Sequence, residues 1–343
     1  MQPDFIFYGI NGGPTALYQL PQPNIYLFWL VGSGNGNVIL LSTKLKQNLG
    51  IIYNGSSIKG ESEICPINEI SSTFVKATTN DLLYDVWIHQ RSYGLINIEL
   101  TITGSTETFF TYKCIERKHI NIKCYGFLKF LTFNDNIFVI DHLDNLCIFN
   151  SLDDNLDFDK TLVNLNRDKY GIPLVMKKIR ENYLIIGTDG GYLLFIDIKI
   201  KKIIFFMKQE KISPIFGIDI YNDKIIVGTR SQKFWIGNFS DILNNISDEI
   251  LYTTIPSEIP SKLTNLIIEP KNGKFFVVTC TDGRFFFCKE SKNNEKSAKP
   301  LKEINYSKST ISSISWESND DISAFNLLVG LREESKLCYW KFS

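Results

Sequence analysis

Short apolar or alternating segments, separated by tight polar turns, repeat along this chain. The clearest example is Leu174–Lys208, which reads LVMKKI, YLIIGT, YLLFIDI and IIFFMK with REN, DGG and KIKK between them. Asp189 and Gly190 lie between the second and third segments, where glycine accepts a positive φ at low cost and so favours a hairpin. β-branched and aromatic residues fill the segments, and no sustained i, i+3, i+4, i+7 stripe competes with them. The pattern therefore predicts four short β-strands.

The four-strand unit recurs seven times, which gives about 49 residues per unit, close to the length of a β-propeller blade. We therefore predict an all-β chain that folds as a seven-bladed β-propeller of the WD-repeat type, a single domain over residues 1–343. In the fifth unit, the later segment EILYTTI is interpreted as the fourth strand. The expected blades lie at 15–55, 66–114, 126–166, 172–209, 214–255, 263–306, and 311–343 together with 4–10.

The last unit contributes only three strand-like segments, ISSISW, FNLLVGL and KLCYWKF. A further strand-like stretch, FIFYGI at Phe5–Ile10, precedes the first unit and belongs to none. We expect this N-terminal strand to supply the fourth strand of the last blade, because that pairing hides a backbone edge that would otherwise be exposed.

Composition and charge restrict the class of protein. Hydrophobic residues make up 44% and charged residues 22%, and 37 basic residues balance 37 acidic ones. A net charge of zero argues against a bulk electrostatic hold on nucleic acid, so we expect no direct nucleic-acid binding. The start MQPDFIFYGINGG does not resemble a secretory signal, and the longest apolar run, Ile25–Val31, is too short to cross a membrane. We expect an intracellular protein that does not bind membranes and is monomeric on its own.

The residues offer little material for catalysis or metal binding. The three histidines lie in three different places along the chain, none of the seven cysteines forms a CxxC pair, and no GxSxG motif occurs. Buried structural cysteines are favoured over a zinc site. Gly32, Gly34 and Gly36 are followed by a strand, not a helix, which favours a hairpin turn over a phosphate-binding loop. We predict no catalytic, cofactor-binding or metal-binding residue, and no cofactor.

The turns joining the second and third strands of the blades are the candidate protein-interaction face, because in a propeller they share one face with the loops between blades. Arginine is common at interface hot spots. The alternative is a polar rim that only holds its own turns, with aspartates anchoring backbone amides. Two basic segments, Lys199–Lys202 and Lys113–Lys123, are interpreted as solvated turns in preference to nucleic-acid patches. The candidate residues of the face are His89, Arg91, Asp189, Arg230, Asp282, Arg284 and Arg332.

The repeat resembles the WD-repeat superfamily in a degenerate form. At the expected ends of the third strands, only Trp340 keeps the tryptophan and only Asp197 keeps the acid, and the usual Gly-His pair is absent from every unit. The hydrogen-bond network built on those residues is therefore incomplete. Each lost bond costs only about 1 kcal/mol, so apolar packing can still stabilise the fold.

More narrowly, the chain resembles the fungal ASTRA-associated protein family, which is related to guanine-nucleotide-binding protein β-subunit-like proteins. The similar segments occur in the same order along nearly the whole chain. In the second of them, His89 and Arg91 match the family pattern and Ser92 replaces the expected aspartate. The segments are GSGNGNVILLSTKLKQNLG, YDVWIHQRSYGLINIEL, KYGIP with LIIGTDGGYLLFIDIKIKK, and LLVGLREESKLCYWKF.

The resemblance implies a non-enzymatic scaffold subunit of the ASTRA complex in the nucleus, where that assembly is linked to chromatin remodelling and to maturation of phosphatidylinositol-3-kinase-related kinases. The implied partners are Tel-type and Tti-type adaptors, Rvb-type AAA+ ATPases and kinases of the PIKK type. Two alternatives stay open. One is a cytoplasmic adaptor of another signalling or trafficking complex, and the other is an enzyme that uses the central channel of the propeller.

Overall fold

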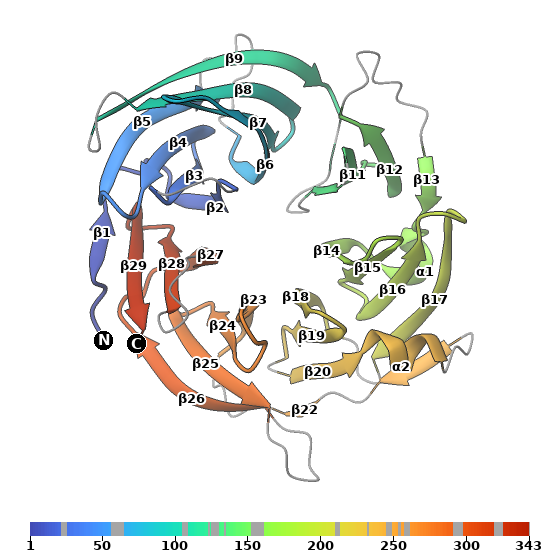
Figure 1. Ribbon diagram of the computed structural model, residues 1–343. Coiled ribbons are helices and arrows are strands. Elements are labelled where there is room, and N and C mark those ends of the chain that lie inside the picture. Colours follow the sequence, from blue (N-terminus) through green and yellow to red (C-terminus); the bar gives the residue numbers. More distant parts are fainter. Residues whose placement is uncertain are drawn as a thin grey trace. The chain divides into compact units, whose positions relative to one another are not determined.

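The computed structural model describes most of the chain as β-sheet (Figure 1). The chain packs as two compact units, each treated by itself below. The middle unit comprises residues 128–308 with Met1, and the terminal unit comprises residues 2–127 and 309–343. The described residues are 1–21, 26–55, 65–104, 109–122, 124, 130–133, 135–151, 161–209, 213–231, 233–244, 249–252, 255–256, 261–290, 298–318 and 325–342.

The terminal unit contains three antiparallel four-stranded sheets. The first blade consists of β2 (Pro14–Gln19), β3 (Phe28–Ser33), β4 (Asn37–Ser42) and β5 (Gln47–Asn54). The second blade consists of β6 (Ile67–Ala77), β7 (Asp81–Gln90), β8 (Gly94–Gly104) and β9 (Phe110–Ile120). The seventh blade consists of β27 (Ile311–Glu317), β28 (Phe325–Leu331), β29 (Lys336–Phe342) and β1 (Phe5–Phe7).

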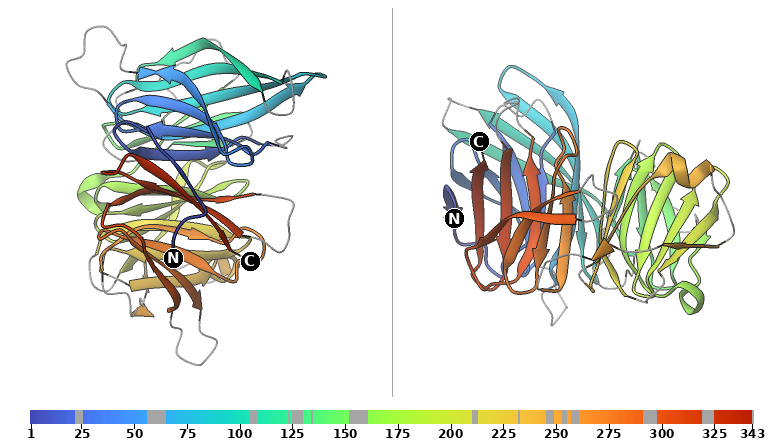
Figure 2. Two further views of the ribbon diagram at one scale, coloured as in Figure 1. Left: turned by 90° about the vertical axis from the view of Figure 1, so that its left-hand side faces the viewer. Right: turned by 90° about the horizontal axis from the view of Figure 1, so that it is seen from below.

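The N-terminal strand completes the seventh blade, as predicted. β1 runs antiparallel to β29, with Phe5 opposite Tyr339 and Phe7 opposite Leu337 (Figure 2). Beyond the strand, the amide of Asp4 donates to the Tyr339 carbonyl. The outer edge of β29 is therefore covered by a segment more than 300 residues away in the sequence.

The middle unit contains four sheets. The third blade is β10 (Leu131–Phe133), β11 (Asn136–Ile140), β12 (Asn145–Asn150) and β13 (Thr161–Asn164). The fourth is β14 (Pro173–Arg180), β15 (Tyr183–Thr188), β16 (Tyr192–Asp197) and β17 (Lys202–Gln209). The fifth is β18 (Ile215–Tyr221), β19 (Lys224–Thr229), β20 (Lys233–Asn238) and β22 (Ile255–Pro256). The sixth is β23 (Leu263–Ile268), β24 (Phe276–Cys280), β25 (Arg284–Glu290) and β26 (Ala298–Asn305).

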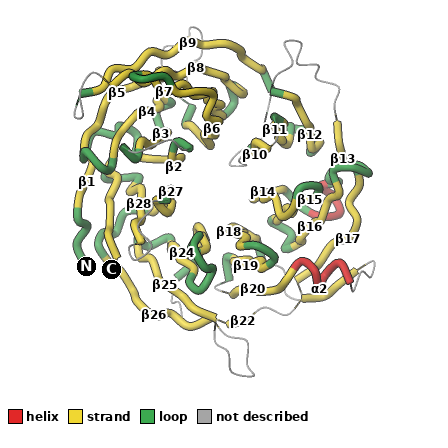
Figure 3. Tube along the Cα trace, viewed as in Figure 1, coloured by secondary structure: helices red, strands yellow, loops and turns green. Residues whose placement is uncertain are grey.

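These seven sheets confirm the predicted fold class, an all-β, seven-bladed β-propeller of the WD-repeat type. The described helices, drawn red in Figure 3, are short: α1 (Arg167–Tyr170) and α2 (Phe239–Asn244). Apolar side chains on facing sheets pack into shared clusters. In the middle unit, Ile226, Leu266 and Val278 belong to one cluster that joins the fifth and sixth blades.

One strand pairs differently from the prediction. The segment EILYTTI is predicted as the fourth strand of the fifth blade, but its first four residues form β21 (Glu249–Tyr252), which runs parallel to β17 as a fifth strand of the fourth blade. The fourth-strand position of the fifth blade, beside β20, is taken by β22, with Ile255 opposite Phe234 and Pro256 opposite Lys233. The reason lies in α2, whose Phe239 is buried and stacks on Phe195 of the fourth blade, with ring centroids 6.0 Å apart. The helix thus carries the chain toward that blade before the strand begins.

Candidate functional site

In the first, second and fourth to seventh blades, the turn between the second and third strands is bonded to the loop that leads into the same blade. We call these turns and lead-in loops together the turn face. In each case a backbone amide of the turn donates to a carbonyl of the loop over 2.9–3.1 Å. The pairs are Gly34 with Gly13, Arg91 with Pro66, Asp189 with Ile172, Arg230 with Pro214, Thr281 with Lys262, and Arg332 with Thr310. This repeated bond holds the loops in place where the Gly-His pattern of WD repeats is missing.

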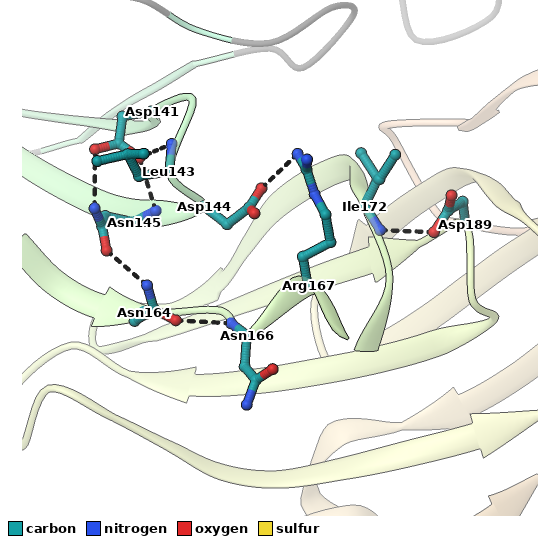
Figure 4. A network of polar contacts seen from close by, with 9 residues as sticks. All are labelled: Asp141, Leu143, Asp144, Asn145, Asn164, Asn166, Arg167, Ile172 and Asp189. Atoms are coloured by element: carbon teal, nitrogen blue, oxygen red, sulfur yellow. Dashed lines mark hydrogen bonds and ion pairs between the residues drawn. The ribbon is translucent and has the colours of Figure 1, made fainter. Parts of the chain in front are cut away.

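In the third blade, side chains extend this framework (Figure 4). The Asp141 carboxylate accepts hydrogen bonds from the backbone amides of Leu143 and Asn145, both at 2.8 Å. The Asn145 side-chain oxygen accepts from Asn164 at 2.9 Å, and the Asn164 oxygen accepts from the Asn166 amide at 3.0 Å. A turn and the loop that leaves the same blade are thereby joined in one network.

The connection into the fourth blade is fixed by two further contacts (Figure 4). Arg167 pairs with Asp144 at 2.9 Å, and Asp189 accepts a 2.6 Å hydrogen bond from the backbone amide of Ile172. While the polar groups are bonded to one another, two apolar side chains stay exposed, Leu143 at 62% and Ile172 at 39%. The turn face of the middle unit therefore presents apolar side chains on loops that are held firmly by hydrogen bonds.

In the sixth blade, Asp282 and Arg284 are bonded to each other. The Arg284 guanidinium donates to the Asp282 carboxylate at 2.6 and 2.8 Å and to Glu303 at 3.2 Å. Ser261, in the lead-in loop, also donates to Asp282. Burial by itself raises the pKa of Asp282, but the hydrogen bonds from Arg284 and Ser261 hold that pKa below its usual value. This carboxylate therefore remains charged and fastens its own blade.

The remaining predicted residues differ in accessibility. Arg230 is exposed, and its guanidinium lies 5.7 Å from the centre of the Phe216 ring. In the terminal unit, Arg332 is exposed and Arg91 is half-buried. His89 is only 1% exposed, so its side chain contributes to the interior of the second blade.

Two turn residues that the sequence interpretation did not select have the same structural role as Asp189 and Asp282. Glu333 accepts hydrogen bonds from the Ser309 hydroxyl at 2.5 Å and from the Thr310 amide at 2.7 Å. The buried Gln90 donates to the Cys65 carbonyl, in the loop that leads into its own blade, at 3.1 Å. Their signal in the sequence is positional, because both lie in or directly before a turn between the second and third strands.

A charged contact joins first strands of neighbouring blades in the middle unit. Lys177 on β14 pairs with Asp219 on β18 at 3.1 Å, and Asp219 also accepts a 2.6 Å bond from the Ile268 amide on β23. Burial lowers the pKa of the neighbouring Lys178, whose ammonium contacts the Phe133 ring. The Asp219 carboxylate therefore links the fourth, fifth and sixth blades. Its charge is engaged in structural contacts, whereas an enzyme that used the channel would need charged groups available for catalysis.

Metal-binding and thiol chemistry find little support in the part of the chain that the structure describes. No group of three His, Cys, Asp or Glu residues there is arranged to hold a metal ion. Burial raises the pKa of Cys280 and of Cys288 to about 12, so both thiols stay protonated near neutral pH. Among the described residues, no helix has the length and apolar composition needed to cross a membrane.

Comparisons with known proteins agree with the fold. Neither the protein-family models nor the curated proteins gave a match. Among solved structures, the chain is similar to the computationally designed protein Ika8, with a TM-score of 0.61, 10% identity and 100% coverage of both chains. It is also similar to Raptor of Chaetomium thermophilum, with a TM-score of 0.68 and 11% identity over 100% of this chain and 29% of Raptor.

At these identities the likeness concerns the fold alone. The chain shares the β-propeller fold with these structures. Similarity extends to 1214 solved chains, so the fold by itself does not select one function among many.

Proposed function

We propose that this protein is a non-enzymatic scaffold that binds partner proteins through the turn face of its middle unit. The observation that carries this proposal is the exposure of Leu143 and Ile172 on loops whose polar groups are bonded internally. Ordered loops lose little conformational entropy on binding, which favours association. Exposed apolar side chains beside ion pairs are also typical of interface centres with polar rims.

The finer proposal is that the protein is a subunit of the ASTRA complex, acts in the nucleus, and contributes to chromatin remodelling and kinase maturation. Its support is the ordered series of sequence segments that resemble the ASTRA-associated family. The partners would be Tel-type and Tti-type adaptors, Rvb-type AAA+ ATPases and PIKK-type kinases. A cytoplasmic adaptor of another signalling or trafficking complex would use the same face, and its partner list would differ.

Affinity purification of the tagged full chain tests both the scaffold proposal and the ASTRA assignment. We expect the wild-type chain to recover stoichiometric protein partners and the double variant Leu143→Glu/Ile172→Glu to recover at least about tenfold less, because two charges would replace the apolar contact. The matched control is Ile200→Glu/Leu301→Glu, which charges two exposed apolar residues, each 56% exposed, outside the turn face.

Three outcomes test the scaffold proposal, the location of the interface and the ASTRA assignment in turn. Recovery of no stoichiometric partner by the wild type would refute the scaffold proposal. Equal recovery by the two double variants would move the interface away from the turn face. Partners that include neither Tel/Tti-type adaptors nor Rvb-type ATPases would refute the ASTRA assignment and favour the alternative adaptor.

A further inference from the structure

Carboxylates in the turn face of the middle unit are largely engaged by the chain itself. Asp144 pairs with Arg167, Asp189 accepts from the Ile172 amide, and Asp282 is bonded to Arg284. Asp168 on α1 is exposed, and it lies in the connection before β14. From the fifth blade onward, the described acids of this face have little capacity left for a partner.

Two cations in the fifth and sixth blades differ from these acids. Arg230, in the turn after β19, and Lys262, in the loop before β23, are both exposed. Their backbones take part in the turn-to-loop bonds, with the Arg230 amide donating and the Lys262 carbonyl accepting. Their side-chain charges, however, form no ion pair among the described residues. The guanidinium of Arg230 lies over the ring of Phe216, a contact that positions it without neutralising it.

The two cations belong to the same end of neighbouring blades. β18 and β23 pack side by side, and a Cβ on Gly228 would lie 3.6 Å from the Cδ1 of Leu263. Arg230 follows Gly228 by two residues, and Lys262 directly precedes Leu263. This packing therefore holds the turn that carries Arg230 and the loop that carries Lys262 in place on adjacent blades.

We propose that Arg230, Lys262 and the ring of Phe216 form a recognition site for an acidic segment of a partner protein. This inference rests on the proposed scaffold function and names the chemistry of the partner. A guanidinium can bind a carboxylate through two parallel hydrogen bonds, and the neighbouring ammonium adds a second point of attraction. Since the local acids are engaged, an incoming carboxylate meets little like-charge repulsion.

The test measures binding of the full chain to a fluorescein-labelled peptide with six consecutive glutamates. A peptide with glutamine in their place is the ligand control, and a peptide with two phosphoserines separates phosphate from carboxylate recognition. We expect the glutamate peptide to bind in low salt, to bind more weakly as salt rises, and to bind at least about tenfold more tightly than the glutamine peptide.

The protein variants locate the site. Arg230→Glu/Lys262→Glu should weaken binding of the glutamate peptide at least about tenfold, and Arg230→Lys should weaken it less, because it keeps the charge and loses the fork of donors. The control Lys199→Glu/Lys201→Glu makes the same charge change at the β16–β17 turn, where both lysines are exposed, and should leave binding within about twofold. Thermal melts verify that each variant is folded.

The outcomes separate this inference from the scaffold proposal. Peptide binding that depends on Arg230 and Lys262, without any partner in the affinity purification, keeps the site and refutes the scaffold. Partner recovery that is unchanged by Arg230→Glu/Lys262→Glu, or equal losses in both charge variants, refutes the site and keeps the scaffold. Tighter binding of the phosphoserine peptide would assign the site to phosphorylated segments, and tighter binding of a single-stranded oligonucleotide would overturn a protein partner.

Discussion

At the scale of single residues, a buried acid in the terminal unit joins two blades through hydrogen bonds. Glu317, at the end of β27, is 3% exposed. Its carboxylate accepts hydrogen bonds from Tyr339 at 2.9 Å and Asn326 at 2.8 Å in its own blade, and from Trp29 at 3.3 Å and Thr43 in the first blade. Burying a carboxylate is tolerable because four donors replace water, and these donors join two blades.

We expect Glu317→Ala to destabilise the protein by roughly 3 kcal/mol, because it leaves several buried donors without an acceptor. Glu317→Gln should cost less, since one acceptor oxygen remains. Urea denaturation measures both free energies of unfolding. The control is Glu181→Ala, an exposed position expected to change stability by less than about 0.5 kcal/mol. Equal effects at the two sites would show that the buried network contributes nothing.

At the scale of elements, a glycine near the end of the second strand lets neighbouring blades approach closely. It occurs as Gly32 in LVGS, Gly187 in IIGT, Gly228 in IVGT and Gly330 in LVGL. A Cβ on Gly187 would lie 2.6 Å from the Cγ2 of Ile215, the first residue of β18. A side chain at this position would therefore push the first strand of the next blade away.

Gly187→Ala should cost about 1–3 kcal/mol through overpacking. Combining it with Ile215→Ala removes the Cγ2 methyl, which is the closest atom, so the double variant should be more stable than the sum of the two single effects predicts, although Cγ1 of Val175 would still lie 2.9 Å from the added Cβ. Thermal or chemical unfolding of the four proteins of this cycle measures the coupling. Strict additivity would mean that the contact does not limit how closely the blades pack.

At the scale of the whole molecule, the seventh blade is assembled from both ends of the sequence. Phe7 and Ile10 are buried, and they share a cluster with Trp29, Leu328 and Tyr339. The N-terminal segment therefore covers a strand edge and also fills part of the core between two blades. We therefore expect the N-terminal segment to unfold together with the rest of the terminal unit in one cooperative transition.

Deleting residues 1–10 should lower the thermal midpoint and promote association, because the outer edge of β29 and the apolar cluster become exposed. Deleting only residues 1–3 keeps β1 and Asp4, whose carboxylate accepts from the Lys341 amide at 2.7 Å, and should change the midpoint little. Differential scanning calorimetry with light scattering measures both effects. An unchanged midpoint after the longer deletion would contradict the closing role of β1.

The sequence alone determined the strands, their grouping into seven units and the N-terminal closure, because alternation of apolar residues and turn glycines are local properties of the chain. Tertiary structure alone decided the pairing of Glu249–Tyr252 with β17, the burial of His89 and the four donors around Glu317. It also separated Asp189 and Asp282, which anchor their own blades, from Arg230, whose charge remains exposed. These outcomes depend on which surfaces meet, and residues far apart in the sequence supply them.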